Sequence, residues 1–150
     1  MRLVIQRVSS SSVIIDDKDE NKIGRGLNIL IGICDEDTDS DIEWLIRKVM
    51  NLRIFPDEND VMNKSILDIQ GDFLVISQFT LYASTKKGNR PSYIRSSKPP
   101  FAEPMYEKFV DKLRSESKLK VETGKFGSDM QVSIENDGPV TIIIDSHNKE

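Results

Sequence analysis

The chain has 150 residues, of which 37% are hydrophobic and 31% charged, and its formal net charge is -4. This length predicts a single domain, spanning residues 1–150, that buries about two-thirds of its unfolded surface. Cys34, the only cysteine, excludes a disulfide framework within the chain. No apolar run approaches the ~20 residues that a membrane-spanning helix needs. Because the N-terminus also lacks the apolar core of a signal peptide, we expect a cytoplasmic protein.

The residue inventory also excludes several kinds of catalysis. His147, the only histidine, lies in a polar tail that we expect to be mobile, and Cys34 ends an apolar run typical of a buried strand. A Ser/His/Asp triad, a Cys/His dyad and a Cys/His zinc site therefore lack their parts. The carboxylates from Asp35 to Asp41 do not have the spacing of a calcium loop. We expect no metal and no cofactor, and any hydrolysis must proceed without a histidine base.

Strands are predicted at the start of the chain. The segments 2–8 and 11–16 resemble a short strand pair, with Ser9 to Ser12 as a connection or a bulge. The apolar run 26–34 is typical of a strand that is buried on both faces.

Helical spacing begins near residue 40. The apolar residues of the first predicted helix fall at i, i+3, i+4 and i+7, and Thr38 with Asp41 indicates its N-terminal cap. A second helix is predicted over 102–117, with Pro104 in its first turn. Further strands are predicted at 52–55, 73–82, 118–124, 129–136 and 140–145. The pattern predicts an α+β domain of short, mostly antiparallel strands with two helices packed outside.

The predicted strand 73–82 contains an unusual set of polar residues, namely Ser77, Gln78 and Thr80. An unpartnered buried polar side chain costs about 1–3 kcal/mol, so these groups must be hydrogen-bonded or must face a pocket. They either bond to neighbouring backbone at a strand end or belong to a site, and the pattern alone leaves both interpretations open. Alternation would place Gln78 and Thr80 on one face and Ser77 and Phe79 on the other.

A basic loop follows this strand. Within thirteen residues the chain carries Lys86, Lys87, Arg90, Arg95 and Lys98, although its overall charge is negative. Such a local excess favours an anionic partner such as a phosphate backbone. A solvated face is the alternative, and charge runs more often have that role.

These segments belong to a longer resemblance. The stretches "NLRIF", "SQFTL", "TKKGNRPS" and "FGSDMQVSIENDGPVT" together resemble the D-aminoacyl-tRNA deacylase family. The resemblance runs in the same order from "MRLVIQRV" to "GPVTIIIDS" and covers all but the last few residues. Both motifs typical of the family, Ser-Gln-x-Thr-Leu and Asn-x-Gly-Pro-Val-Thr, are intact.

The resemblance implies a homodimer of β-barrel-like subunits with active sites at the subunit interface. Such enzymes hydrolyse the ester between a D-amino acid and the terminal adenosine of a tRNA, and they also act on glycyl-tRNA. By motif, the residues expected to line the catalytic pocket are Ser77, Gln78, Phe79 and Thr80. Substrate-binding residues are expected at Gly138, Pro139 and Met130, although a core role for Met130 is equally open. The residues expected to contact the tRNA are Lys86, Lys87 and Arg90.

One residue agrees with the main branch of the family and another departs from the family pattern. Ser77 distinguishes it from a related branch that has proline at this position and relaxed chirality. Asn89 stands where many relatives have a basic residue, which is expected to weaken the contact with tRNA.

The role of Thr80 has two interpretations. Its hydroxyl can attack the ester, but threonine needs a base and the motif contains none. The favoured alternative is that Thr80 positions the substrate, while backbone amides near Phe79 and Thr80 stabilise the oxyanion. Water, positioned by the 2′-hydroxyl of the adenosine, would then be the nucleophile.

The pair Gly138-Pro139 precedes a predicted strand, and on the simplest interpretation it is a turn that orients the strand. The resemblance implies more: a cis peptide whose two carbonyls enter the partner's pocket near Ser77 to Thr80. There they would bind the substrate's amino group and exclude an L side chain.

Two other classes of function remain open. A nucleic-acid-binding module without catalysis would share the basic loop and the polar strand. A small-molecule hydrolase would share the pocket, but its turnover would not depend on salt.

Overall fold

The computed structural model describes residues 1–149. Its elements in chain order are β1 (Arg2–Ile15), β2 (Asp19–Ile23), β3 (Gly26–Gly32), α1 (Asp39–Asn51), β4 (Phe55–Pro56), β5 (Met62–Lys64), α2 (Ile66–Ile69), β6 (Asp72–Ser77), the 3₁₀-helix η1 (Phe79–Tyr82), α3 (Pro99–Ser117), β7 (Val121–Thr123) and β8 (Met130–Asp145).

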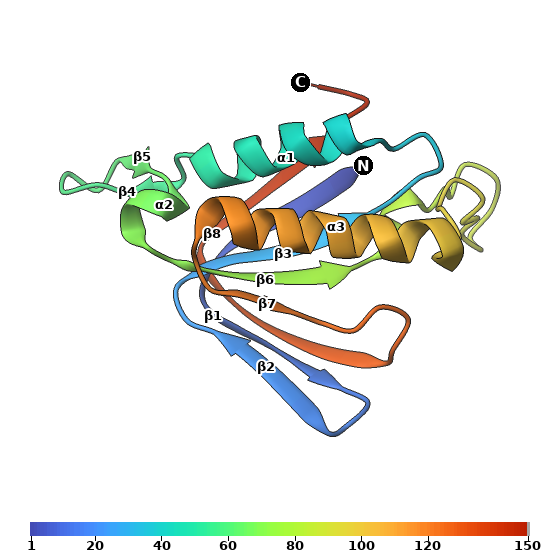
Figure 1. Cartoon of the computed structure of the whole chain (residues 1–150), viewed down its shortest axis with the longest axis horizontal. Helices are drawn as coiled ribbons and strands as arrows, with labels where there is room; N and C mark the ends of the chain where they lie inside the picture. Colours follow the sequence, from blue (N-terminus) through green and yellow to red (C-terminus); the bar gives the residue numbers. More distant parts are fainter. Residues whose placement is uncertain (150) are drawn as a thin grey trace.

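One curled sheet organises the molecule. Its strand order is β2-β1-β3-β6-β7, and β8 pairs with β1 along almost its whole length, on the edge opposite to β2 and β3. Strand β1 is antiparallel to β2, β3 and β8, whereas β6 is parallel to β3 and β7. The long helices α1 and α3 lie side by side across one face, and the remaining strands curl away below (Figure 1). The expected α+β, barrel-like class with mostly antiparallel strands and two packed helices is confirmed.

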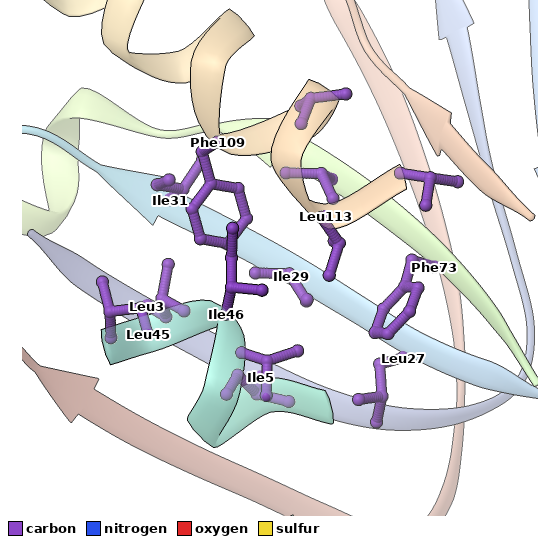
Figure 2. Packing of buried hydrophobic residues seen from close by; sticks show 14 of the residues in the cluster. Leu3, Ile5, Leu27, Ile29, Ile31, Leu45, Ile46, Phe73, Phe109 and Leu113 are labelled. Carbon is purple, nitrogen blue, oxygen red and sulfur yellow. The ribbon is translucent and has the colours of Figure 1, made fainter. Parts of the chain in front are cut away.

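The main core lies between the helices and the sheet (Figure 2). Ile46 of α1 and Phe109 of α3 pack against Ile29 and Ile31 of β3, and all four are at most 1% exposed. Burial of each such side chain contributes about 1.5–3 kcal/mol. The apolar stripe that predicted α1 is the face that packs on this core.

A second core fills the inside of the curl. Leu74 and Ile76 of β6 point to this side, whereas Phe73 and Val75 point to the helices. Both faces of the strand are therefore buried, which requires a continuous apolar run. This arrangement holds β6 in a fixed position, and the polar residues Ser77 and Gln78 come directly after it.

The structure corrects several predicted boundaries. The segments 2–8 and 11–16 form one strand, because β1 continues through register shifts between Gln6 and Ser10. The segments 129–136 and 140–145 likewise form the single strand β8, because both pair with β1. The predicted strand 73–82 ends at Ser77, and 79–82 form a 3₁₀-helix. The capping box of Thr38 and Asp41 at the start of α1 is confirmed.

Gly26 is required by the close approach of β3 and β6. A Cβ on Gly26 would lie 1.9 Å from the carbonyl oxygen of Asp72, a backbone atom that cannot rotate away. We predict that Gly26→Ala lowers the free energy of unfolding by about 3 kcal/mol, because the strands must separate. Urea denaturation followed by the fluorescence of Trp44 measures this change.

Gly24→Ala is the matched control. The nearest atom to its added Cβ would be 3.7 Å away, so the change is expected to stay within about 0.5 kcal/mol. Equal stability of the two variants would contradict the packing argument.

Candidate active site

The polar residues after β6 mark the point at which the strand leaves the sheet. Ser77 is the last residue of β6 to pair with β3, opposite Ile31, and the Gln78 N–H donates to the Ile31 carbonyl at 2.7 Å. The chain then turns into η1, and the Gln78 side chain donates from Nε2 to the Thr80 hydroxyl at 2.5 Å. Gln78 and Thr80 thus bond to each other at the strand end, whereas Ser77 and Phe79 line a pocket that Gln78 and Thr80 do not line.

The pocket beside this turn has a volume of about 360 Å³. The rings of Phe79 and Tyr93 meet edge to face across it, with centroids 5.1 Å apart. Phe79 is 55% exposed, so its ring is open to a ligand. The remaining lining residues are Ser77, Ser96, Ser97, Lys98, Pro99, Phe126 and Gly127. An apolar slot with aromatic walls and a few hydroxyl groups is suited to a planar ring that carries polar groups.

Hydrogen bonds fix the loop that forms the far wall of the pocket. The Ser96 hydroxyl donates to the Phe79 carbonyl at 2.6 Å. The Ser97 N–H donates to the Ile33 carbonyl at 2.9 Å, and its hydroxyl bonds to Asp35. The segment 93–97 is therefore held against both η1 and the end of β3.

The pocket contains no obvious base. Within residues 1–149, no carboxylate or imidazole is hydrogen-bonded to Thr80, whose hydroxyl accepts a bond from Gln78. Cys34 is buried, and this burial raises the pKa of its thiol and disfavours the thiolate. Catalysis that needs a histidine or cysteine nucleophile is not supported by this arrangement.

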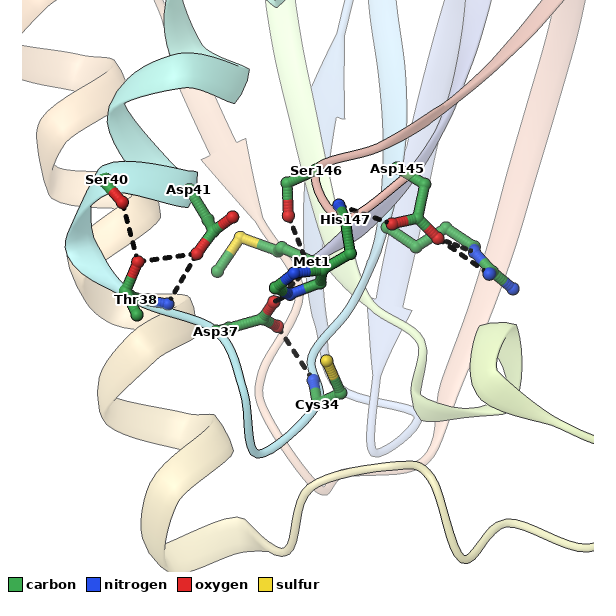
Figure 3. A network of polar contacts seen from close by, with 10 residues as sticks. Met1, Cys34, Asp37, Thr38, Ser40, Asp41, Asp145, Ser146 and His147 are labelled. Carbon is green, nitrogen blue, oxygen red and sulfur yellow. Dashed lines mark hydrogen bonds and ion pairs between the residues drawn. The ribbon is translucent and has the colours of Figure 1, made fainter. Parts of the chain in front are cut away.

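The expected mobility of the tail around His147 is wrong. The His147 ring bonds to the buried carboxylate of Asp37 at 2.7 Å, and the same carboxylate also bonds to the Met1 ammonium group and, at 2.8 Å, to the Cys34 N–H (Figure 3). The tail is anchored because Asp37, being only 4% exposed, requires partners for its charge. Sequence spacing gives no signal for a contact between residues 110 positions apart.

The Gly138-Pro139 peptide bond is cis, as the resemblance predicted. Gly138 has a φ of 125°, a conformation that favours glycine, and its added Cβ would lie 2.8 Å from the Arg7 guanidinium. The pair sits in a bulge, because Gln6 pairs with Thr141 while Val8 already pairs with Asn136. Both residues of the pair are exposed.

Arg7 holds this bulge from behind. Its Nε donates to the Asp137 carbonyl at 3.0 Å and one terminal nitrogen donates to the Ile54 carbonyl at 2.6 Å. A second contact with Asp137 is an ion pair at 3.3 Å. Arg7 is only 8% exposed, so its position is fixed by packing as well as by these bonds.

The two motifs do not meet within one chain. Ser77 pairs through Ile31 with Leu3, whereas the bulge lies beside Arg7, four residues further along β1. Three strand spacings of about 4.8 Å and four residues of about 3.3 Å separate the motifs by roughly 20 Å along the sheet.

The other predicted site residues lie in two places. Met130 is half-buried and packs on the core inside the curl, with its sulfur beside Gly124, and it does not line the pocket. Lys86, Lys87 and Arg90 are exposed on a loop whose ends pair at Ser84 and Ser92.

Sequence reasoning missed three contributors. Tyr93 and Phe126 line the pocket but lie far from the polar strand in sequence, and Arg7 supports the Gly-Pro bulge from within β1. An arginine inside an otherwise apolar strand was the available signal, because a buried charge needs partners.

Comparison with known families identifies this arrangement. A family model described as D-Tyr-tRNA(Tyr) deacylase matches residues 4–145. The chain belongs to the D-Tyr-tRNA(Tyr) deacylase family. The resemblance inferred from the two motifs is therefore confirmed.

Relatives in this family are similar over their full length. A D-aminoacyl-tRNA deacylase of Flavobacterium psychrophilum is 61% identical over 150 residues, which is 100% of each chain. One of Bacteroides fragilis is 58% identical over the same length. A solved structure described as c-Myc DNA Unwinding Element Binding Protein is 42% identical, with a TM-score of 0.89 over 97% of this chain and 98% of the other. A probable eukaryotic D-amino acid tRNA deacylase, 18% identical with a TM-score of 0.83 over 95% and 97% of the chains, shares the fold.

Arg7 is predicted to stabilise the deacylase fold at the bulge. Arg7→Lys keeps the charge but cannot reach the Asp137 and Ile54 carbonyls together. We expect the free energy of unfolding to fall by about 1.5–3 kcal/mol, as measured by urea denaturation. Arg25→Lys is the control, because Arg25 is exposed and its guanidinium lies over the Phe55 ring at 5.6 Å. A fall of equal size in both variants would contradict this role for Arg7.

Proposed function

We propose that the protein hydrolyses the ester between a D-amino acid and the terminal adenosine of a tRNA, releasing both as free products. The observation that carries this proposal is the full-length similarity to relatives named D-aminoacyl-tRNA deacylase, at 61% identity. Glycyl-tRNA is a second substrate, because glycine has no side chain to reject. The reaction removes wrongly charged tRNAs before translation uses them. No helix within residues 1–149 is long and apolar enough to cross a membrane.

The pocket beside η1 receives the terminal adenosine. The Phe79, Tyr93 and Phe126 rings offer surfaces on which the base can stack, and such stacking contributes about 1–3 kcal/mol per base. A base seated there brings the ribose and its ester towards the segment from Ser77 to Thr80.

The backbone at the start of η1 stabilises the transition state. Phe79 and Thr80 occupy its first two positions, where N–H groups have no acceptor within the helix. Directed at the ester carbonyl, each such donor contributes about 3 kcal/mol as negative charge develops on the oxygen.

Water is the nucleophile in this mechanism. The Thr80 hydroxyl accepts a hydrogen bond from Gln78, so its own proton is free to position the substrate. The adenosine 2′-hydroxyl orients the attacking water. The C–O bond to the 3′-oxygen then breaks, and this oxygen takes up the proton that the water loses.

A second copy of the chain supplies Gly138 and Pro139. The separation of the two motifs within one chain supports this homodimer. The exposed side of β8 supports it as well. Along β8 the side chains of Val140, Ile142 and Ile144 pack on the core, whereas Ile143 on the opposite side is 67% exposed. The exposed side of β8 therefore offers an apolar surface on the same strand as the Gly-Pro pair.

Rigid backbone would provide the chiral selection. The two carbonyls of the cis pair, entering the partner's pocket, accept hydrogen bonds from the amino group of the substrate. They also occupy the space into which an L side chain would project, while a D side chain points out of the pocket. Since no side chain is read, many D-amino acids are accepted.

The basic loop would bind the tRNA outside the pocket. Lys86, Lys87 and Arg90 are fully available to phosphate groups, since within residues 1–149 they form no ion pair. Their contribution falls with rising salt, as expected for phosphate contacts.

DNA binding without catalysis is the second candidate. The structure that is 42% identical is described as a DNA unwinding element binding protein, which favours this alternative. The deacylase is favoured by the aromatic walls of the pocket beside η1. It is also favoured by the N–H groups of Phe79 and Thr80, which have no acceptor within η1.

The proposed function is tested with D-tyrosyl-tRNA and L-tyrosyl-tRNA as matched substrates. We expect rapid hydrolysis of the D-ester, and hydrolysis of the L-ester no faster than without protein. The decrease of acid-precipitable label with time measures both rates. Binding of both without turnover would contradict the proposal and favour the DNA- or RNA-binding alternative.

The homodimer is tested by placing a charge on the exposed side of β8. Ile143→Glu would bury an unpaired carboxylate in the interface, so we expect a monomer in sedimentation and loss of most D-ester hydrolysis. Val61→Glu is the control, because Val61 is 56% exposed on the loop between β4 and β5. A fully active Ile143→Glu monomer would show that one chain forms a complete site.

A further inference from the structure

A second, larger cavity lies directly behind the loop that walls the adenosine pocket. Its volume is about 730 Å³, and its lining includes Tyr82, Ile94 and Arg95. Tyr93, the preceding residue, lines the adenosine pocket. The two cavities therefore lie on either side of one short segment, whose position is fixed by the bonds of Ser96 and Ser97.

Both cavities border the 3₁₀-helix η1, since Phe79 lines the first and Tyr82 lines the second. Because side chains three residues apart align in such a helix, Phe79 and Tyr82 occupy the same side of it. Phe79 contacts Tyr93 in the first cavity, and Tyr82 lies under Arg95 in the second, with the guanidinium 5.5 Å from the ring centre. A ligand that extends from one cavity along η1 reaches the other.

Arg95 is the cation of this cavity that has no carboxylate partner. Arg2 bonds to Asp145 at 2.7 and 2.9 Å, and His147 bonds to Asp37. Within residues 1–149, the exposed Arg95 forms no hydrogen bond or ion pair, and the Tyr82 ring is its contact. Its guanidinium is therefore available to an anion.

Tyr82 is a second, independent feature of the cavity. Its side chain is only 2% exposed, and this burial together with the neighbouring Cys34 thiol raises the pKa of its hydroxyl. The hydroxyl therefore faces the protein interior, and the ring is the part of Tyr82 that lies under Arg95.

We propose that this cavity binds the nucleotide that precedes the terminal adenosine of the substrate, with its phosphate on Arg95. This proposal rests on the proposed function, since it assumes that the adenosine occupies the pocket beside η1. The next nucleotide of a tRNA acceptor end is a cytidine.

The rest of the cavity wall suits a cytosine base. Ile94 is 91% exposed and offers a flat apolar contact. Glu36 also lines the cavity and is exposed, and a carboxylate is the usual acceptor for the exocyclic amino group of cytosine. The other two carboxylates of the lining already have partners within the protein, since Asp35 bonds to Ser97 and Asp145 bonds to Arg2.

The test compares three D-tyrosyl esters of increasing length: adenosine, the trinucleotide CCA and full tRNA. Arg95→Gln removes the phosphate contact, so we expect kcat/KM to fall roughly tenfold on the trinucleotide and the tRNA. Hydrolysis of the adenosine ester, which lacks this phosphate, should be unchanged.

Arg25→Gln is the matched control. Arg25 is exposed and, like Arg95, lies over an aromatic ring, that of Phe55, at 5.6 Å. It lines neither cavity, so all three substrates should react as with the original protein.

Three results would overturn the inference. These are an equal loss by Arg95→Gln on all three esters, no loss on any of them, and a loss on tRNA alone. If the original protein hydrolyses none of the D-esters, the proposed function fails instead. The subsite is then tested by direct binding, in which Arg95→Gln must weaken binding of the CCA trinucleotide but not of adenosine.

Discussion

Pairing of β1 with both β3 and β8 is the interaction on which the rest of the structure depends. Through β3, β1 fixes the end of β6 and hence the turn from Ser77 to Thr80. Through β8, it fixes the bulge that presents Gly138 and Pro139. One strand thus sets the position of both motifs, and its register shifts create the bulge where β8 has residues in excess.

In the proposed mechanism, backbone groups replace the catalytic side chains that this chain lacks. Its only histidine is bonded to Asp37 and its only cysteine is buried, so both serve the structure around the N-terminus. Backbone N–H groups and carbonyls are well suited to an ester substrate, since they need no change of protonation and are held by the surrounding fold. The surrounding packing is accordingly dense, with buried residues on both faces of β6.

The two cavities lie along η1 and the segment 93–97 that packs on it. Phe79 and Tyr82, three residues apart, each form the floor of a different cavity. Lys86 and Lys87 are exposed on the neighbouring loop, whereas Arg95 lies over the Tyr82 ring, 5.5 Å from its centre. An extended anionic ligand would stack on aromatic rings in the pocket, and its distant phosphates would be attracted by the charges of the loop.

The sequence by itself determined the two long helices, several strands and the two motifs, but not β2 or α2. Helical spacing from Ile42 to Val49 and the Thr38 cap are local signals, and they were sufficient for α1, because periodicity reports which face is buried. The end of β6 at Ser77 was not predicted, since alternation alone does not show where a strand loses its neighbour. Only the tertiary structure placed Tyr93 and Arg95 beside η1, anchored His147 on Asp37 and separated Gly138 from Thr80. These contacts join residues far apart in the chain, and their distances depend on strand register, which no local pattern encodes.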